Sequence, residues 1–198
     1  MRRGSPIAPE NTQAWVLAGG LSSRMGRDKA LLQREGITLL EGTIAKLAGV
    51  VQHTTVIGPP ERYPFLNVPV VADLIPGCGP ISGLHTALTL TQSDWNLLVA
   101  CDMPNLTANM LRAMLLATPN TAAHDTNSKC LVAQDLHGGL HPLCAVYHRD
   151  LLPAVANRIE HKWFKLQDLL KEIDAQAFSI ADVSLLANIN TPAQWETV

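Results

Sequence analysis

Residues 15–29 have the sequence Trp-Val-Leu-Ala-Gly-Gly-Leu-Ser-Ser-Arg-Met-Gly-Arg-Asp-Lys. The apolar run at residues 14–18 predicts a buried strand, and Gly19 and Gly20 directly after it allow backbone conformations that a Cβ atom would obstruct. Small residues follow, which leave backbone N–H groups free to face an anion, and three cations lie among them: Arg24, Arg27 and Lys29. We therefore predict a loop that binds a polyphosphate at the end of a strand.

This loop differs from two common phosphate-binding motifs. A Walker A loop requires Ser or Thr after its lysine, but Lys29 precedes Ala30, and no Gly-x-Gly-x-x-Gly motif is present. The plain alternative is a glycine-rich surface loop whose charges are solvated. The preceding strand and the close spacing of the cations favour phosphate binding.

The composition indicates one packed domain. The chain has 198 residues, of which 47% are hydrophobic and 16% charged. We expect the domain at residues 13–198, after a loose tail at residues 1–12. The net charge is −2 and the longest run of basic residues is the pair Arg2-Arg3, so neither a nucleic-acid partner nor a membrane surface is indicated.

Cysteine spacing and hydropathy suggest a cellular compartment. The four cysteines form no Cys-x-x-Cys pair, which favours buried free thiols in a reducing environment. No apolar run approaches the roughly 20 residues needed to span a bilayer, and the N-terminus lacks the apolar core of a signal peptide. We therefore expect a cytoplasmic protein.

Apolar strands and amphipathic helices alternate along the chain, which is typical of a mostly parallel, twisted α/β sheet with helices on both faces. A hairpin or an excursion from the sheet is expected within residues 119–139. A short extended piece is expected at residues 30–32 and a final helical turn at Pro192. The predicted strands are 14–18, 50–57, 68–72, 96–101, 130–134, 143–147 and an edge strand at 177–180, and the predicted helices are 38–48, 79–90, 106–117, 149–159 and 163–173.

Ligands of open α/β sheets bind beyond the carboxyl ends of the strands, and two acidic residues follow predicted strands. Asp73 is followed by a turn-rich segment that contains Gly79 and Pro80, and Asp102 ends the most apolar strand. An Asp there could simply cap a helix or close a turn. Because a phosphate loop is expected across the cleft, and Mg²⁺ binds one or two carboxylates together with phosphate oxygens, we predict that Asp102 is a metal ligand.

The histidines offer a weaker metal hypothesis. His137 and His141 are the closest pair, but Gly138, Gly139 and Pro142 argue against a helix that would place both on one face. Turn and capping roles are therefore favoured for this pair.

Together, the motifs resemble the molybdenum cofactor guanylyltransferases of the MobA type. The resemblance extends over residues 14–196, and the His-Pro and Asn-x-Asn-Thr-Pro elements narrow it within the larger group of nucleotidyltransferases. The motifs are Leu-Ala-Gly-Gly-x-x-x-Arg-Met-Gly-x-Asp-Lys at 17–29, Asp73 with Gly-Pro-Ile-Ser-Gly at 79–83, Cys-Asp-Met-Pro at 101–104, His-Pro at 141–142 and Asn-Ile-Asn-Thr-Pro at 188–192.

The resemblance implies a Rossmann-like nucleotidyltransferase fold and the Mg²⁺-dependent transfer of GMP from GTP to molybdenum-bound molybdopterin, with release of pyrophosphate. It also implies protein partners that deliver or accept the cofactor. By similarity, the nucleotide would be held by Leu17, Ala18, Gly19, Gly20, Arg24, Lys29, Asp73, Gly79, Pro80 and Asp102. Catalysis would depend on Arg24, Lys29 and Mg²⁺-bound Asp102, and the pterin would lie near His141, Asn188 and Asn190.

The chain departs from the family pattern at two places. Gly58 stands where the family commonly has an Asn that touches the nucleotide, and residues 161–164 replace a glycine-rich stretch. One alternative is a cytidylyltransferase acting on the same pterin, although that branch tends to have Ala-Ala-Gly where this chain has Ala-Gly-Gly at 18–20. Another alternative is a non-catalytic nucleotide-binding protein or cofactor chaperone.

Overall fold

The computed structural model describes residues 12–18, 28–34, 36–118 and 128–189. Several predicted features lie outside these ranges: residues 1–11 of the tail expected at 1–12, Gly19, Gly20, Arg24, Arg27, Asn190 and the turn at Pro192. The last residue of that tail, Thr12, is the first residue of a strand. No helix among the described residues is long and apolar enough to cross a membrane.

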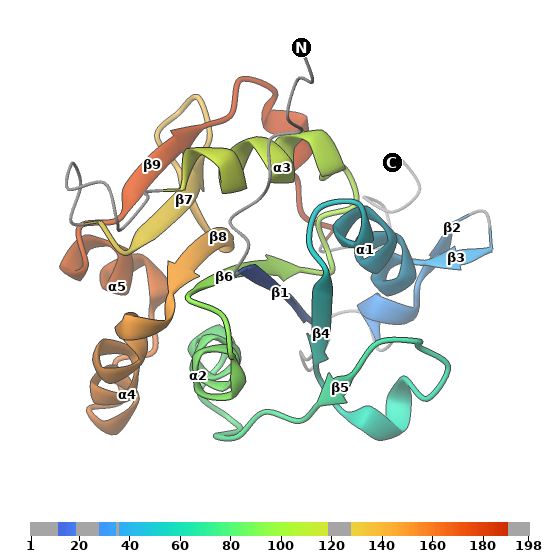
Figure 1. Ribbon diagram of the computed structural model, residues 1–198, viewed down its shortest axis with the longest axis horizontal. Helices are drawn as coiled ribbons and strands as arrows, with labels where there is room; N and C mark the ends of the chain where they lie inside the picture. The colour runs from blue at the N-terminus through green and yellow to red at the C-terminus, as the bar shows by residue number, and fades with distance from the viewer. Residues whose placement is uncertain (1–11, 19–27, 35, 119–127, 190–198) are drawn as a thin grey trace, which may run out of the picture.

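A seven-stranded sheet in the order β5-β4-β1-β6-β8-β7-β9 forms the centre of the molecule (Figure 1). Only β8 runs antiparallel to its two neighbours, and the other adjacent pairs are parallel, so the predicted mostly parallel sheet is confirmed. The strands are β1 (Thr12–Leu17), β4 (His53–Ile57), β5 (Val70–Val71), β6 (Trp95–Ala100), β7 (Cys130–Gln134), β8 (Leu140–His148) and β9 (Gln176–Ser179), with a separate small hairpin of β2 (Gln33–Arg34) and β3 (Ile37–Thr38).

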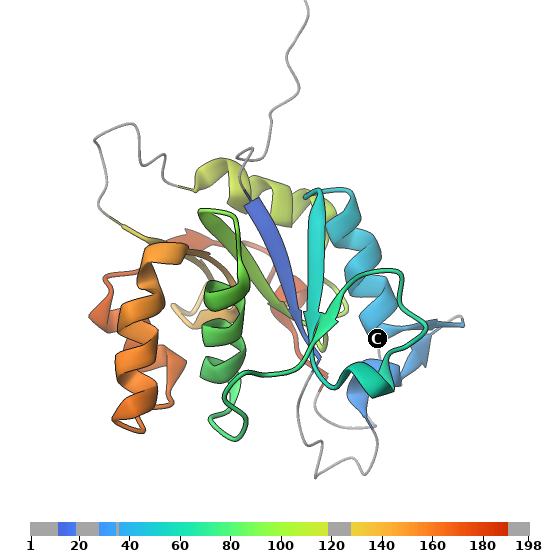
Figure 2. The same cartoon turned by 60° about the horizontal axis from the view of Figure 1, so that its bottom comes forward.

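Helices cover both faces of this sheet, as Figures 1 and 2 show. Helices α1 (Leu39–Ala48) and α3 (Ala108–Ala117) pack on one face, and α2 (Pro80–Leu90), α4 (Leu152–Glu160) and α5 (Leu166–Glu172) pack on the other. Side chains alternate between the faces along a strand, so Ala14 and Val16 belong to the first core and Trp15 to the second. The helix termini are specified locally; Thr38 and Glu41, for example, form a capping box at the start of α1.

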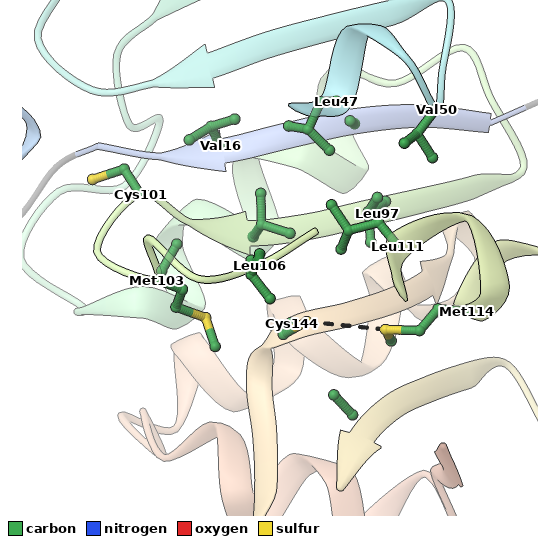
Figure 3. Close-up of a cluster of buried hydrophobic side chains, with 14 of the residues drawn as sticks. Val16, Leu47, Val50, Leu97, Cys101, Met103, Leu106, Leu111, Met114 and Cys144 are labelled. Atoms are coloured by element: carbon green, nitrogen blue, oxygen red, sulfur yellow. Dashed lines mark hydrogen bonds between the residues drawn. The ribbon is translucent and has the colours of Figure 1, made fainter. Parts of the chain in front are cut away.

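The first core is shown in Figure 3, where side chains from β1 and β6 meet those of α1 and α3. Met114 of α3 lies against Cys144 of β8, so the interpretation of the α3 methionines as core residues is correct. All six residues of β6 are buried, and its one amide, Asn96, accepts a hydrogen bond from Trp15 Nε1 at 3.0 Å. The four cysteines are unpaired, three of them buried: Cys101, Cys130 and Cys144.

Several predicted boundaries require correction. Of the piece expected to be extended at 30–32, only Leu32 is extended, because Asp28 caps a 3-10 turn at Lys29–Leu31 by accepting a hydrogen bond from Ala30 N at 3.1 Å. The helix expected from residue 163 begins only at Leu166, after Lys162 adopts a positive φ of 60°. The helix expected at 149–159 is a 3-10 turn at Arg149–Leu151 followed by α4. Strand β5 is shorter than predicted and β8 is longer, and β7 pairs with β8 as a hairpin inside the sheet.

Candidate active site

The carboxyl ends of three parallel strands meet at one edge of the sheet. Leu17 of β1 is in register with Ile57 of β4 and with Ala100 of β6. The pairing continues past the strands, because Ala18 N donates to Ile57 O at 2.9 Å and Cys101 N donates to Leu17 O at 3.2 Å. The residues that follow these strands are therefore neighbours, as expected for an open α/β sheet.

Lys29 and Asp102 face each other at this edge, with 3.8 Å between Lys29 Nζ and Asp102 Oδ2. Their side chains are only 19% and 23% exposed. Burial raises the pKa of Asp102, and the neighbouring Lys29 ammonium opposes this rise. The other carboxylate oxygen, Oδ1, is buried and receives no hydrogen bond from the described residues. A buried carboxylate oxygen without a donor is suited to a cation.

The donor set around Asp102 matches one kind of metal site. The described residues contain no group of three or more His, Cys, Asp or Glu side chains that could enclose a metal ion. Mg²⁺ does not require such a group when it is shared with a nucleotide, because it typically takes one or two carboxylates and completes its shell with phosphate oxygens and water. Asp102, with its unpartnered Oδ1, fits that arrangement.

The second acidic residue, Asp73, is fixed against α2. Asp73 Oδ1 accepts a hydrogen bond from Thr86 Oγ1 at 3.3 Å, and Leu74 N donates to the same hydroxyl oxygen at 3.0 Å. Gly79 has a φ of 71° and is the N-cap of α2, which begins at Pro80. Gly83 lets this helix approach β1 closely, because a Cβ atom there would overlap the side-chain end of Leu17.

The MobA-like NTP transferase domain matches residues 14–177. The chain belongs to this family. A protein of Nostoc sp., named as a probable molybdenum cofactor guanylyltransferase, is 34% identical over 92% of this chain and 87% of its own length. A protein of Carboxydothermus hydrogenoformans with the same name is 28% identical over 94% of both chains. The crystal structure of molybdopterin-guanine dinucleotide biosynthesis protein A from Archaeoglobus fulgidus, 21% identical, has the same fold, with a TM-score of 0.76 over 93% of this chain and 95% of that one.

Two further predicted residues of this MobA-like transferase lie at the same edge. His141 lies near the start of β8, in the strand rather than in a turn, and its Nε2 is 3.1 Å from Asp135 Oδ2. Asp135 also accepts hydrogen bonds from the backbone of His137 and Gly139, so it closes the β7–β8 turn. Asn188 is exposed and precedes Ile189, whose N–H donates to Asp102 O at 2.9 Å.

The segment that replaces the family's glycine-rich stretch forms the connection between α4 and α5. The rings of His161 and Trp163 stack there, with centroids 4.9 Å apart and planes at 28°. Trp163 is 54% exposed, so this MobA-like protein presents an aromatic surface in that connection.

One residue that contacts the site was missed in the sequence. The hydroxyl oxygen of Tyr63 lies 2.7 Å from Ala18 O and 2.8 Å from Asp28 Oδ2. Tyr63 follows the turn that begins at Gly58, where the chain departs from the family pattern. That departure is the feature of the sequence that could have drawn attention to the residues around the turn.

Proposed function

We propose that this MobA-like transferase moves GMP from GTP to molybdenum-bound molybdopterin, forms the guanine dinucleotide form of the cofactor and releases pyrophosphate. The observation that carries the proposal is the pairing of Lys29 with Asp102 at the carboxyl ends of β1 and β6. The names of relatives that match more than nine-tenths of the chain supply the substrate identities.

Charge neutralisation and alignment are the main tasks of such a site. Lys29 would neutralise negative charge on the triphosphate, and Asp102 would hold Mg²⁺, which when bound supplies further positive charge to the phosphate oxygens. We assign Arg24, which lies outside the described residues, to the same task. A phosphate oxygen of the pterin attacks the α-phosphorus of GTP, and the bond from that phosphorus to the pyrophosphate oxygen breaks. Because a phosphate monoester is largely ionised at neutral pH, with a second pKa of about 6, no strong general base is required.

The two substrates would approach this edge from different strands. We assign the nucleotide to the loop after β1 and to the start of α2, and the pterin to the start of β8 and the chain after Ala187. The nucleotide residues are Leu17, Ala18, Gly19, Gly20, Lys29, Asp73, Gly79 and Pro80, and the pterin residues are His141, Asn188 and Asn190. We also propose that the reaction takes place in the cytoplasm, with proteins that deliver or accept the pterin.

Calorimetric titration with GTP, CTP and ATP, each with and without Mg²⁺, tests the nucleotide assignment. Selective binding of GTP that Mg²⁺ strengthens supports the proposal, and preference for CTP would instead identify a cytidylyltransferase. Pyrophosphate release in the presence of molybdenum-bound molybdopterin then separates an enzyme from a nucleotide-binding chaperone. Binding of GTP without turnover would refute catalysis.

A further inference from the structure

We propose that Tyr63 is a positioning residue that sets the place of Lys29 relative to Asp102. This inference rests on the proposed nucleotide transfer at that pair. Tyr63 contacts neither member of the pair. It acts through the two residues that its hydroxyl group joins: Ala18, directly after β1, by its carbonyl oxygen, and Asp28, directly before Lys29, by its carboxylate.

The geometry around the phenol oxygen is compact. Tyr63 is 1% exposed, and its single O–H proton has two acceptors within reach, the carbonyl oxygen of Ala18 at 2.7 Å and Oδ2 of Asp28 at 2.8 Å. Burial and the Asp28 carboxylate raise the pKa of Tyr63, so the hydroxyl keeps its proton and remains a donor. Ala18 and Asp28, the described residues on either side of segment 19–27 of the phosphate motif, therefore both contact this one oxygen atom.

Asp28 transmits this anchoring to Lys29. While Oδ2 faces Tyr63, Oδ1 of the same carboxylate accepts a hydrogen bond from Ala30 N and caps the 3-10 turn whose first residue is Lys29. Arg62, next to Tyr63, adds a second contact, with its Nη1 3.5 Å from Asp28 Oδ2. This contact joins the turn at residues 60–62 to the N-cap of the turn at residues 29–31.

The absence of a side chain at Gly58 leaves room for the Tyr63 ring beside Ala18. A Cβ atom at position 58 would lie 3.0 Å from Tyr63 Cε2 and 3.4 Å from the carbonyl carbon of Ala18. A Cβ atom at position 58 would therefore require the Tyr63 ring to shift by a few tenths of an ångström relative to Ala18. Gly58 and the buried Tyr63 therefore pack against each other, and each residue is suited to the other.

The variant Tyr63→Phe tests the inference, because it removes the hydroxyl group and keeps the ring. Tyr147→Phe is the matched control: Tyr147 is fully buried in the other core, and its hydroxyl group donates to Pro142 O at 2.8 Å. Both variants lose one buried phenolic hydrogen bond, so similar decreases in Tm are expected. We expect kcat for pyrophosphate release to fall about tenfold in Tyr63→Phe, the typical effect of a lost hydrogen bond to a charged group. Because Pro142 adjoins His141, the control readout for Tyr147→Phe is the dissociation constant for Mg²⁺-GTP, which should stay within twofold of the parent's.

A double-mutant cycle shows whether Tyr63 acts through Lys29. The dissociation constant for Mg²⁺-GTP is measured calorimetrically for the parent, Tyr63→Phe, Lys29→Ala and the double variant. If the hydroxyl group acts by placing Lys29, Tyr63→Phe weakens binding in the parent and has no further effect once Lys29 is absent. Additive effects of the two substitutions would overturn the inference.

A readout without ligand separates this inference from the proposed function. Trypsin cleavage after Arg24 and Arg27, followed by mass spectrometry, reports on the stretch of chain between Ala18 and Asp28, the two residues that the Tyr63 hydroxyl group contacts. We expect faster cleavage there in Tyr63→Phe than in Tyr147→Phe; equal rates in the two variants would overturn the anchoring role. If the variants differ in this way but the parent releases no pyrophosphate, the proposed function fails and the anchoring role of Tyr63 stands.

Discussion

Replacing Asp102 with asparagine removes one negative charge from the candidate active site and leaves the size of the side chain unchanged. The pair that it disrupts has 3.8 Å between Lys29 Nζ and Asp102 Oδ2. In a medium of effective dielectric constant near 20, such a pair attracts by about 4 kcal/mol. Burial nevertheless raises the pKa of Asp102, which means that desolvation of the carboxylate outweighs the attraction of Lys29. We therefore expect the free energy of unfolding of Asp102→Asn to lie within about 1 kcal/mol of the parent's value. For a chain of this size, this corresponds to a difference in Tm of roughly 2–4 °C.

The effect on turnover should be much larger than the effect on folding. Asn at position 102 has no charge with which to hold Mg²⁺ against the triphosphate. Loss of one preorganised electrostatic group typically costs about 100-fold in rate, which corresponds to about 2.7 kcal/mol of activation free energy, and we expect at least this decrease in pyrophosphate release. Mg²⁺ should also cease to strengthen GTP binding, while binding of metal-free GTP should be unchanged or tighter because one repulsive charge is absent.

Asp150→Asn provides the matched control. Asp150 pairs with Lys129 at 3.1 Å, and it follows β8 at the opposite edge of the sheet, where Trp95 of β6 is in register with His148. This variant should retain the parent's turnover and its response to Mg²⁺. Equal rates of pyrophosphate release for the parent and Asp102→Asn would refute the assignment of Asp102 to the reaction.

Three further substitutions test the packing around the site and the core. Gly83→Ala places a Cβ atom against Leu17, so GTP affinity should fall several-fold in calorimetry with a stability loss of about 1 kcal/mol, the lower limit for overpacking; unchanged affinity would contradict the assignment of the start of α2 to the nucleotide. Asn96→Leu leaves the Trp15 indole N–H without its acceptor and should lower the free energy of unfolding in urea by about 1–3 kcal/mol. Burial lowers the pKa of His148, so the unfolded chain binds a proton at a higher pH than the folded chain does. The free energy of unfolding should therefore decrease as the pH falls below about 6.5, and this pH dependence should be weaker in His148→Gln.

The sequence predicts features that depend on local pattern better than those that depend on distant contacts. The strand at Cys130–Gln134 has the predicted bounds, and helix α2 begins beside the predicted residue, because apolar runs and turn residues mark both. Asp102 could be placed at a strand end for the same reason. The distance between Asp102 and Lys29 cannot be predicted from sequence, because it depends on how the chain folds between them. Tyr63 was missed for a similar reason: the parallel pairing of β1 with β4 brings Ala18 and Asp28 to it.

The single reversed strand explains how residues far apart in the chain can serve one reaction. In β1 and β6 the last residues face the site, but β8 runs in the opposite direction, so its first residues reach the same edge. Val99 of β6 is in register with Cys144, which places His141, three residues earlier in β8, beyond the end of β6 and on the side of Asp102. A parallel β8 would carry His141 to the far edge of the sheet. The residues that we assign to the nucleotide therefore come from strand ends, and His141, which we assign to the pterin, comes from a strand start. Under the proposed function, the two substrates would reach Asp102 from different strands.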